Sequence, residues 1–205
     1  MTANFMENSF QRILPLCICL VAAGCAQKVA IATNDQLANA QPPVKEEMRS
    51  GIITYEGVVF GLTPPQGWLL DAESGIGNGV PVVFYPEGSS WETAKVVMYA
   101  NVTVKHDGET VDSLVRQDMA RFKNDDNSVV ISDMQPIAIG KKQAMVKSFY
   151  GKSPENYEAV AYIDEKQHVV FLVLSAKSMH MFESSLPQFS NLVSSYFYMG
   201  SNGTD

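Results

Sequence analysis

From residue 52 onward, the spacing of the apolar residues switches from the period of a β-strand to that of an α-helix and back. Residues 95–105 carry apolar side chains at every second position, with Asn101 and Thr103 on the opposite face. This spacing predicts a strand with one apolar face. Residues 111–122 carry apolar side chains three and four positions apart, which predicts an amphipathic helix. A chain with this alternation folds into a mixture of strands and helices.

Further β-rich runs between turn residues predict the other strands, at residues 58–62, 68–70, 82–85, 129–134, 143–150, 157–163 and 168–175. The polar gap at 164–167 predicts that its flanking runs form an antiparallel hairpin. The nearly all-apolar run at 168–174 predicts a central strand. Residues 182–196 predict a closing helix, either kinked or restarted at Pro187. We therefore expect an α+β fold, a single domain in which helices pack on an antiparallel β-sheet.

An apolar run at residues 13–24 follows Arg12 and ends directly before Cys25. It is shorter than the roughly 20 residues that span a bilayer and has the length of a signal-peptide core. Residues 20–25, Leu-Val-Ala-Ala-Gly-Cys, resemble the lipobox of bacterial lipoproteins. The resemblance implies a lipid on the Cys25 sulfur and signal cleavage after Gly24. The alternatives are an ordinary signal peptide, cut at small residues, or a buried helix.

Residues 26–50 are rich in Ala, Asn, Gln, Pro and Lys and have no sustained apolar period, which favours a flexible tether over the alternative of a helix at 35–49. The chain then divides into a signal peptide (1–24), a lipidated cysteine with a tether (25–50), a globular domain (51–199) and a disordered tail (200–205). Ala26 follows the cysteine where inner-membrane lipoproteins of enterobacteria carry Asp. By that resemblance, we expect the outer membrane, facing the periplasm, rather than the inner membrane.

The charge balance restricts the partners of the chain. The formal net charge is −7, and the signal region holds one charge of each sign. An acidic chain without a basic block argues against nucleic acid and against charge-driven adsorption to anionic lipid. All three cysteines lie in the first 25 residues, so the domain has no disulfide, thiolate nucleophile or thiolate metal ligand.

The sequence carries none of the familiar catalytic or phosphate-binding motifs. None of the histidines, His106, His168 and His180, is followed two or four residues later by a metal-ligand partner, and His180 with Glu183 is interpreted as a surface pair. The glycine-rich segment 75–79 lacks the spacing of a dinucleotide fingerprint and predicts a mobile loop. We expect no enzymatic activity, no cofactor and no metal.

Three aromatic residues are the candidates for binding: Trp68, Tyr85 and Trp91. Trp91 lies in a polar stretch, where an exposed indole would suit the centre of a protein interface. Burial in the core is the alternative. It is favoured for Trp68, while for Trp91 the two interpretations are balanced.

The segment from Phe60 to Trp68, Phe-Gly-Leu-Thr-Pro-Pro-Gln-Gly-Trp, is similar to an early "strand, Pro-x-Gly-Trp" signature. A middle helix, a glycine and small-residue pattern at 140–144, a hairpin and a helix closing at 194–197 follow it. Over residues 52–198, the chain thus resembles the PsbP-like/DcrB-like superfamily of small α/β/α sandwiches. The resemblance implies a binding or assembly role without catalysis, and no catalytic residues can be carried over.

Three functions are compatible with these features. The first is a non-catalytic envelope lipoprotein, held at a membrane by the lipid on Cys25, that binds an envelope protein or assists assembly. The second is a carrier of a small molecule or cell-wall fragment, with a pocket near Trp68, Trp91 and the 75–79 segment. The third is a hydrolase with dispersed catalytic residues. The absence of motifs and the family resemblance favour the first.

Overall fold

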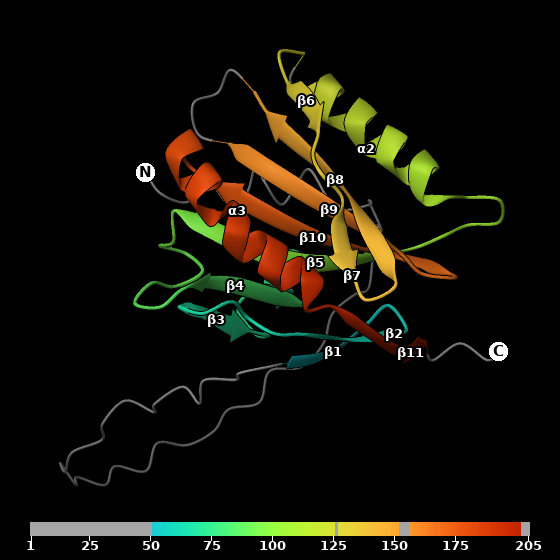
Figure 1. Ribbon diagram of the computed structural model, residues 1–205, viewed down its shortest axis with the longest axis horizontal. Helices are drawn as coiled ribbons and strands as arrows, with labels where there is room; N and C mark the ends of the chain where they lie inside the picture. The colour runs from blue at the N-terminus through green and yellow to red at the C-terminus, as the bar shows by residue number, and fades with distance from the viewer. Residues whose placement is uncertain (1–50, 126, 152–155, 202–205) are drawn as a thin grey trace, which may run out of the picture.

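The computed structural model describes residues 51–125, 127–151 and 156–201 (Figure 1). The predicted signal peptide, Cys25 and tether lie outside these residues. The elements, in chain order, are β1 (Gly51–Tyr55), β2 (Val58–Leu62), β3 (Trp68–Asp71), η1 (Ile76–Asn78), β4 (Val82–Pro86), β5 (Val96–Val104), α2 (Val111–Asp125), β6 (Val130–Asp133), β7 (Ile137–Ile139), β8 (Lys142–Tyr150), β9 (Tyr157–Asp164), β10 (His168–Ala176), α3 (Met179–Ser194) and β11 (Phe197–Ser201). None of the helices among the described residues is long and apolar enough to cross a membrane.

The main sheet is antiparallel, with the strand order β3-β4-β5-β10-β9-β8-β6 and with β7 paired to β8. Its central strand is β10, which is buried along its whole length. β9 and β10 form the predicted antiparallel hairpin, in which Val169 lies opposite Asp164. The expected central strand and hairpin are therefore confirmed, because an unbroken apolar run is stable only where both faces of a strand are covered.

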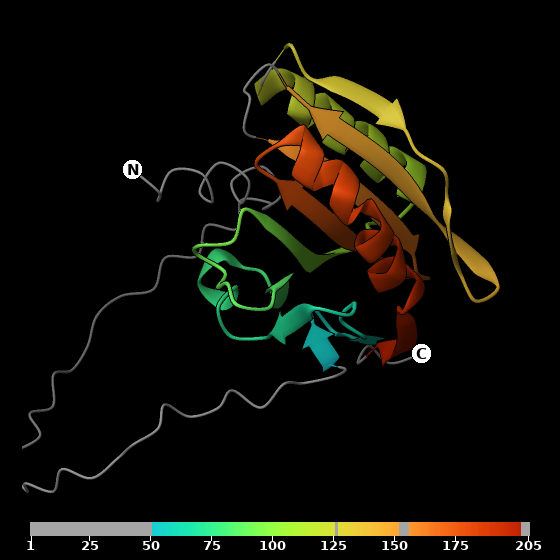
Figure 2. The same cartoon turned by 60° about the vertical axis from the view of Figure 1, so that its left-hand side comes forward.

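The two helices cover opposite faces of this sheet (Figure 2). On one face, α3 packs against β5, β9 and β10 through side chains such as Phe182 and Phe189. On the other face, α2 packs through Leu114, Val115 and Phe122. The result is a three-layer α/β/α arrangement, and the predicted α+β class with helices on an antiparallel sheet is confirmed.

Strand β5 differs from its prediction. Only one apolar face was expected, but most of the strand is buried on both faces, including Tyr99 and Asn101. Helix α2 covers the face that carries these two polar side chains. The apolar residues at every second position identified the face of β5 that packs toward α3. They did not indicate that a helix covers the second face.

Helix α2 begins after Thr110, whose Oγ1 accepts a hydrogen bond from the Ser113 backbone N–H at 3.2 Å. This interaction caps the first turn of the helix. Helix α3 begins after Ser178, whose side chain accepts from the Met181 backbone N–H. It continues as one helix through Pro187, so the restart expected as one alternative does not occur.

A second, three-stranded sheet, with the order β1-β2-β11, lies beside α3 (Figure 1). Its inner side chains join the core on the α3 side, and Phe60 packs against Tyr196 with ring centroids 5.7 Å apart. Strands β1, β7 and β11 were not predicted. Because β11 runs to Ser201, the domain extends two residues beyond its predicted end at 199, and the predicted tail began too early.

Candidate functional site

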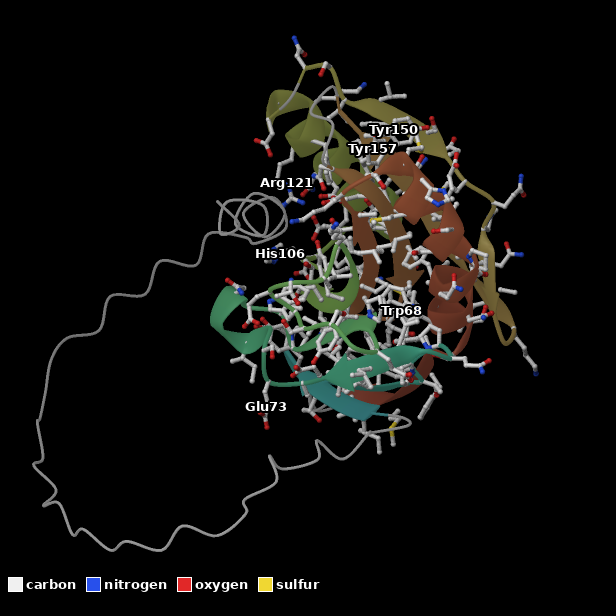
Figure 3. All side chains as sticks on the ribbon, turned by 90° about the vertical axis from the view of Figure 1, so that its left-hand side faces the viewer. Trp68, Glu73, His106, Arg121, Tyr150 and Tyr157 are labelled. Atoms are coloured by element: carbon white, nitrogen blue, oxygen red, sulfur yellow. The ribbon has the colours of Figure 1, made fainter. Side chains whose placement is uncertain are left out.

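The three aromatic candidates for binding are all buried and do not form one surface. Trp68, labelled in Figure 3, joins the core on the α3 side, whereas Tyr85 and Trp91 join the core on the α2 side. Neither tryptophan lines the cavities beneath α2, beside β1 and beside β7 in the described part of the chain. The pocket expected between Trp68, Trp91 and the 75–79 segment is therefore wrong, because the sheet separates the two indoles.

Of the two interpretations left open for Trp91, burial in the core is the correct one, since only 3% of its surface is accessible. A tight turn that contains Trp91 explains the position of its indole. The Ala94 backbone N–H donates to the Ser90 carbonyl at 2.8 Å and closes this turn. The turn directs the ring onto the sheet, where it contacts the Tyr99 ring edge-on, with ring centroids 6.4 Å apart. The polar residues of this stretch form the turn, while the indole contributes to the core.

The Tyr85 hydroxyl has a structural role. It donates to Asp71 Oδ2 at 2.8 Å, and Asp71 Oδ1 accepts from the Glu73 and Ser74 backbone N–H groups at 2.9 and 3.0 Å. These bonds hold the segment after β3, which contains η1. The glycine-rich 75–79 segment, predicted as a mobile loop, forms this short 3-10 helix and ends with Gly79 in the left-handed conformation.

The outer face of the small sheet carries an apolar patch, which we define by Ile52, Val59 and Phe197. Ile52 and Phe197 both lie opposite Gly61 of the middle strand, and they are 67% and 48% exposed. The ring of Phe197 occupies the space that a Cβ on Gly61 would need. A glycine here lets the ring lie flat on the sheet, so that the patch is continuous across its three strands.

A groove of about 370 Å³ runs beside the outer edge of β1. One wall is β1 itself, from Ile52 to Tyr55, and the other is formed by residues of the segment after β3, namely Ala72, Ile76, Gly79, Val80 and Pro81. The Tyr55 hydroxyl donates across the groove to the Gly79 carbonyl at 3.1 Å. Ile52 belongs to both the patch and the groove, so together they form one apolar surface, which we call the β1 surface.

Strand β1 is an edge strand, since within the described ranges its ladder partner is β2. No backbone hydrogen bond joins β1 to the opposite wall of the groove among these residues. An edge of this kind presents backbone N–H and C=O groups that can pair with another strand. The β1 surface therefore combines exposed apolar side chains with a free strand edge.

A second site lies under α2, on the opposite face of the main sheet. Asp118 points from the helix toward the sheet, where its Oδ2 accepts from the Tyr162 hydroxyl at 2.6 Å. Its Oδ1 forms an ion pair with Arg121 one turn later. Burial raises the pKa of the Asp118 carboxyl, opposed by the Arg121 charge. Burial, together with the Asp118 charge, raises the pKa of Tyr162, so the phenol stays protonated as a donor at neutral pH.

The raised pKa of Asp118 predicts how stability depends on pH. The folded protein binds this proton more tightly than the unfolded chain, so acidification through the raised pKa stabilises the fold, and the gain is complete below the ordinary value of 3.8. Asp118→Asn removes this contribution while keeping an acceptor for Tyr162. We expect wild type to gain stability relative to the variant as the pH falls, as measured by urea unfolding at a series of pH values. A relative loss would mean that the Arg121 ion pair outweighs burial.

The sequence offered a signal for one of these sites and none for the other. Asp118 interrupts the apolar stripe of α2, being four residues after Leu114 and three after Val115. An acidic residue on the apolar face of a helix requires a buried partner. By contrast, nothing local marks Ile52 and Phe197 as neighbours, because they lie at opposite ends of the domain.

The described histidines belong to different parts of the fold. His168 is buried in β10 and His180 is exposed on α3. The His106 backbone N–H donates to Glu109 at 3.1 Å, as in a turn. Within residues 51–125, 127–151 and 156–201, no cluster of three potential metal ligands occurs.

The three layers and the strand order define the PsbP-like α+β fold. The solution structure of cyanobacterial PsbP (CyanoP) from Synechocystis sp. PCC 6803 matches with a TM-score of 0.52 and 12% identity, covering 80% of this chain and 99% of that one. A crystal structure from Bacteroides thetaiotaomicron VPI-5482 matches with a TM-score of 0.45 and 11% identity, over 75% of this chain and 49% of that one. No family model and no curated protein matches the sequence. The first structural match confirms the expected PsbP-like fold, and at this identity it bears on the fold alone.

Proposed function

We propose that this protein is a bacterial envelope lipoprotein, anchored through a lipid on Cys25, that acts as a non-catalytic binding module for another envelope protein. The lipobox-like residues 20–25 support the anchor, and Ala26 favours the outer membrane, facing the periplasm. The observation that carries the binding role is the β1 surface. A soluble domain rarely leaves apolar side chains exposed next to a free strand edge unless a partner covers them.

The partner that fits this surface is an extended segment that adds a strand to β1. Its backbone would pair with the free edge, and its side chains would alternate between two environments. One set would continue the row formed by Ile52 and Phe197 on the outer face. The other set would enter the groove, against Ile76 and Val80. The segment should therefore carry apolar residues at successive positions, on both of its faces.

The proposal predicts a large effect of charge at the β1 surface. Ile52→Lys and Ile76→Lys each place an ammonium group where an apolar side chain of the partner would be buried. Burying this charge in the complex is unfavourable, whereas an exposed lysine in the free protein stays hydrated. We expect each variant to capture at least about tenfold less partner than wild type does. This difference corresponds to about 1.4 kcal/mol of binding free energy. Photo-cross-linking in intact cells, with the cross-linker at position 54 of β1, measures the capture.

Val130→Lys is the matched control, because Val130 is 52% exposed and lies on β6, the edge strand at the far side of the main sheet. The control should capture the partner as wild type does. Equal capture by all three lysine variants, or a partner lost only in Val130→Lys, would contradict the assignment of the β1 surface.

A further inference from the structure

The space between α2 and the main sheet contains a cavity of about 270 Å³. Its apolar lining comes from both layers: Leu114 of the helix and Val160, Phe171 and Val173 of the sheet. Its polar lining consists of Thr103, Gln117, Asp118 and Arg121, the last of which is labelled in Figure 3. A smaller apolar cavity, of about 150 Å³, is enough to hold a benzene molecule in a protein interior.

Arg121 brings an unused donor to this cavity. One of its terminal nitrogens pairs with Asp118, but its Nε is buried and has no hydrogen-bond partner among the described residues. A buried N–H group without an acceptor is unfavourable, and native proteins satisfy nearly all such groups. An oxygen acceptor within the cavity would satisfy this one.

The charges around the cavity restrict the kind of acceptor. The positive charge of Arg121 is offset by Asp118, which Tyr162 also holds in place. Glu158, fully buried on the same face of the sheet, adds a further acidic side chain whose charge acts on Tyr162. The cavity therefore has no surplus of positive charge, and an anionic ligand would gain little from Arg121.

We propose that this cavity binds an uncharged, mainly apolar small molecule that carries one carbonyl-type hydrogen-bond acceptor. The acceptor oxygen takes the Nε–H of Arg121, and the apolar body packs against Leu114, Val160 and Phe171. Thr103 and Gln117, at the polar side, are able to donate or accept a further hydrogen bond. This site lies on the face of the sheet opposite α3 and does not depend on the β1 surface.

Three probes of similar size test separately whether the ligand needs an acceptor and whether it must be uncharged. They are benzamide (neutral, with an acceptor), toluene (apolar, without an acceptor) and benzoate (anionic). The full chain in lipid nanodiscs, with ¹³C-labelled Leu and Val methyl groups, is titrated with each probe. We expect benzamide to shift the methyl signals of Leu114, Val160 and Val173 saturably, and to bind more tightly than toluene or benzoate. The methyl signals of Val58, in the small sheet, serve as the internal control.

Two variants test whether Arg121 is the reason why benzamide binds more tightly than toluene and benzoate. Arg121→Lys keeps the charge beside Asp118 but removes the Nε donor, and it should reduce the affinity for benzamide about tenfold while leaving toluene unchanged. Asp118→Asn leaves the charge of Arg121 without its counterion, and it should shift the preference from benzamide toward benzoate. A purely structural role of the two residues would alter the binding of all three probes together.

A third variant, Val160→Phe, fills the cavity and should abolish the benzamide shifts without lowering the melting temperature.

The wild-type titrations alone are able to overturn the proposal. No saturable shift with any probe would remove the site. Tighter binding of benzoate than of benzamide to wild type would contradict an uncharged ligand, and equal binding of toluene and benzamide would contradict the acceptor for Arg121.

Discussion

Replacing Cys25 with alanine is expected to remove all lipid from the protein and to release it from the membrane fraction. The lipobox resemblance places the acyl chains on this sulfur. Each buried CH₂ of a chain contributes about 0.8 kcal/mol to membrane binding, so that several chains together make a stable anchor whereas one chain alone is marginal. Metabolic labelling with an alkyne fatty acid, followed by cell fractionation, measures both effects.

Cys17 and Cys19 provide matched controls for this experiment, because they lie in the same apolar run but not at the lipobox position. Cys17→Ala and Cys19→Ala should be labelled and fractionate as wild type does. Unchanged labelling of Cys25→Ala would contradict the lipoprotein proposal. A wild-type protein that is cleaved but carries no lipid would instead indicate an ordinary signal peptide.

The anchor and the β1 surface are related through the chain. Residues 26–50 join Cys25, the proposed lipidation site, to Gly51, the first residue of β1. As a flexible chain, this segment would reach about 25–30 Å on average. If residues 26–50 form the proposed tether, the proposed partner site lies where this tether meets the domain, within reach of proteins at the same membrane.

Phe122→Ala is expected to be among the most destabilising single substitutions in the domain, costing about 3–5 kcal/mol of unfolding free energy. The Phe122 side chain is 1% exposed and stacks on Phe149 of β8, with ring centroids 4.1 Å apart and an interplanar angle of 18°. It lies one turn after Asp118, so both residues hold α2 on the sheet. Urea unfolding, followed by circular dichroism and by tryptophan fluorescence, measures the loss.

Phe197→Ala is the control with the same chemical change. This ring is about half exposed and rests on Gly61 at the surface, so its removal should cost less than about 1 kcal/mol. Equal losses in the two variants would contradict the assignment of Phe122 to the core beneath α2. The Phe197 variant should nevertheless weaken partner capture, since Phe197 belongs to the β1 surface.

Where apolar spacing is regular, the sequence predicted the local structure correctly. The unbroken apolar run of β10, the polar gap before it and the stripe of α2 each lie within fewer than twenty residues, and each pattern is diagnostic of one conformation. Strand β11 was missed because it has no regular apolar spacing. Its five residues, Phe-Tyr-Met-Gly-Ser, show no alternation, and they form a strand by pairing with β2.

The candidate sites divide in the same way. The acidic Asp118 within an apolar stripe could have been recognised from helical spacing, but its partner Tyr162 could not, since the two residues are 44 positions apart. Trp91 shows a different limit of local reasoning. Its polar neighbours left exposure and burial balanced, whereas the fold uses those neighbours as a turn and buries the indole against Tyr99.

By itself, the sequence determined the succession of the main-sheet strands and the two α-helices, the central position of β10 and hence the α+β class, because hydrophobic periodicity acts over short distances along the chain. Only the tertiary structure decided that both faces of β5 are covered, that β11 completes a second sheet and that Ile52, Gly61 and Phe197 form one row. It also decided which polar groups meet beneath α2. These features depend on which distant segments pack together, and that choice is made by the burial of the whole core rather than by any local pattern.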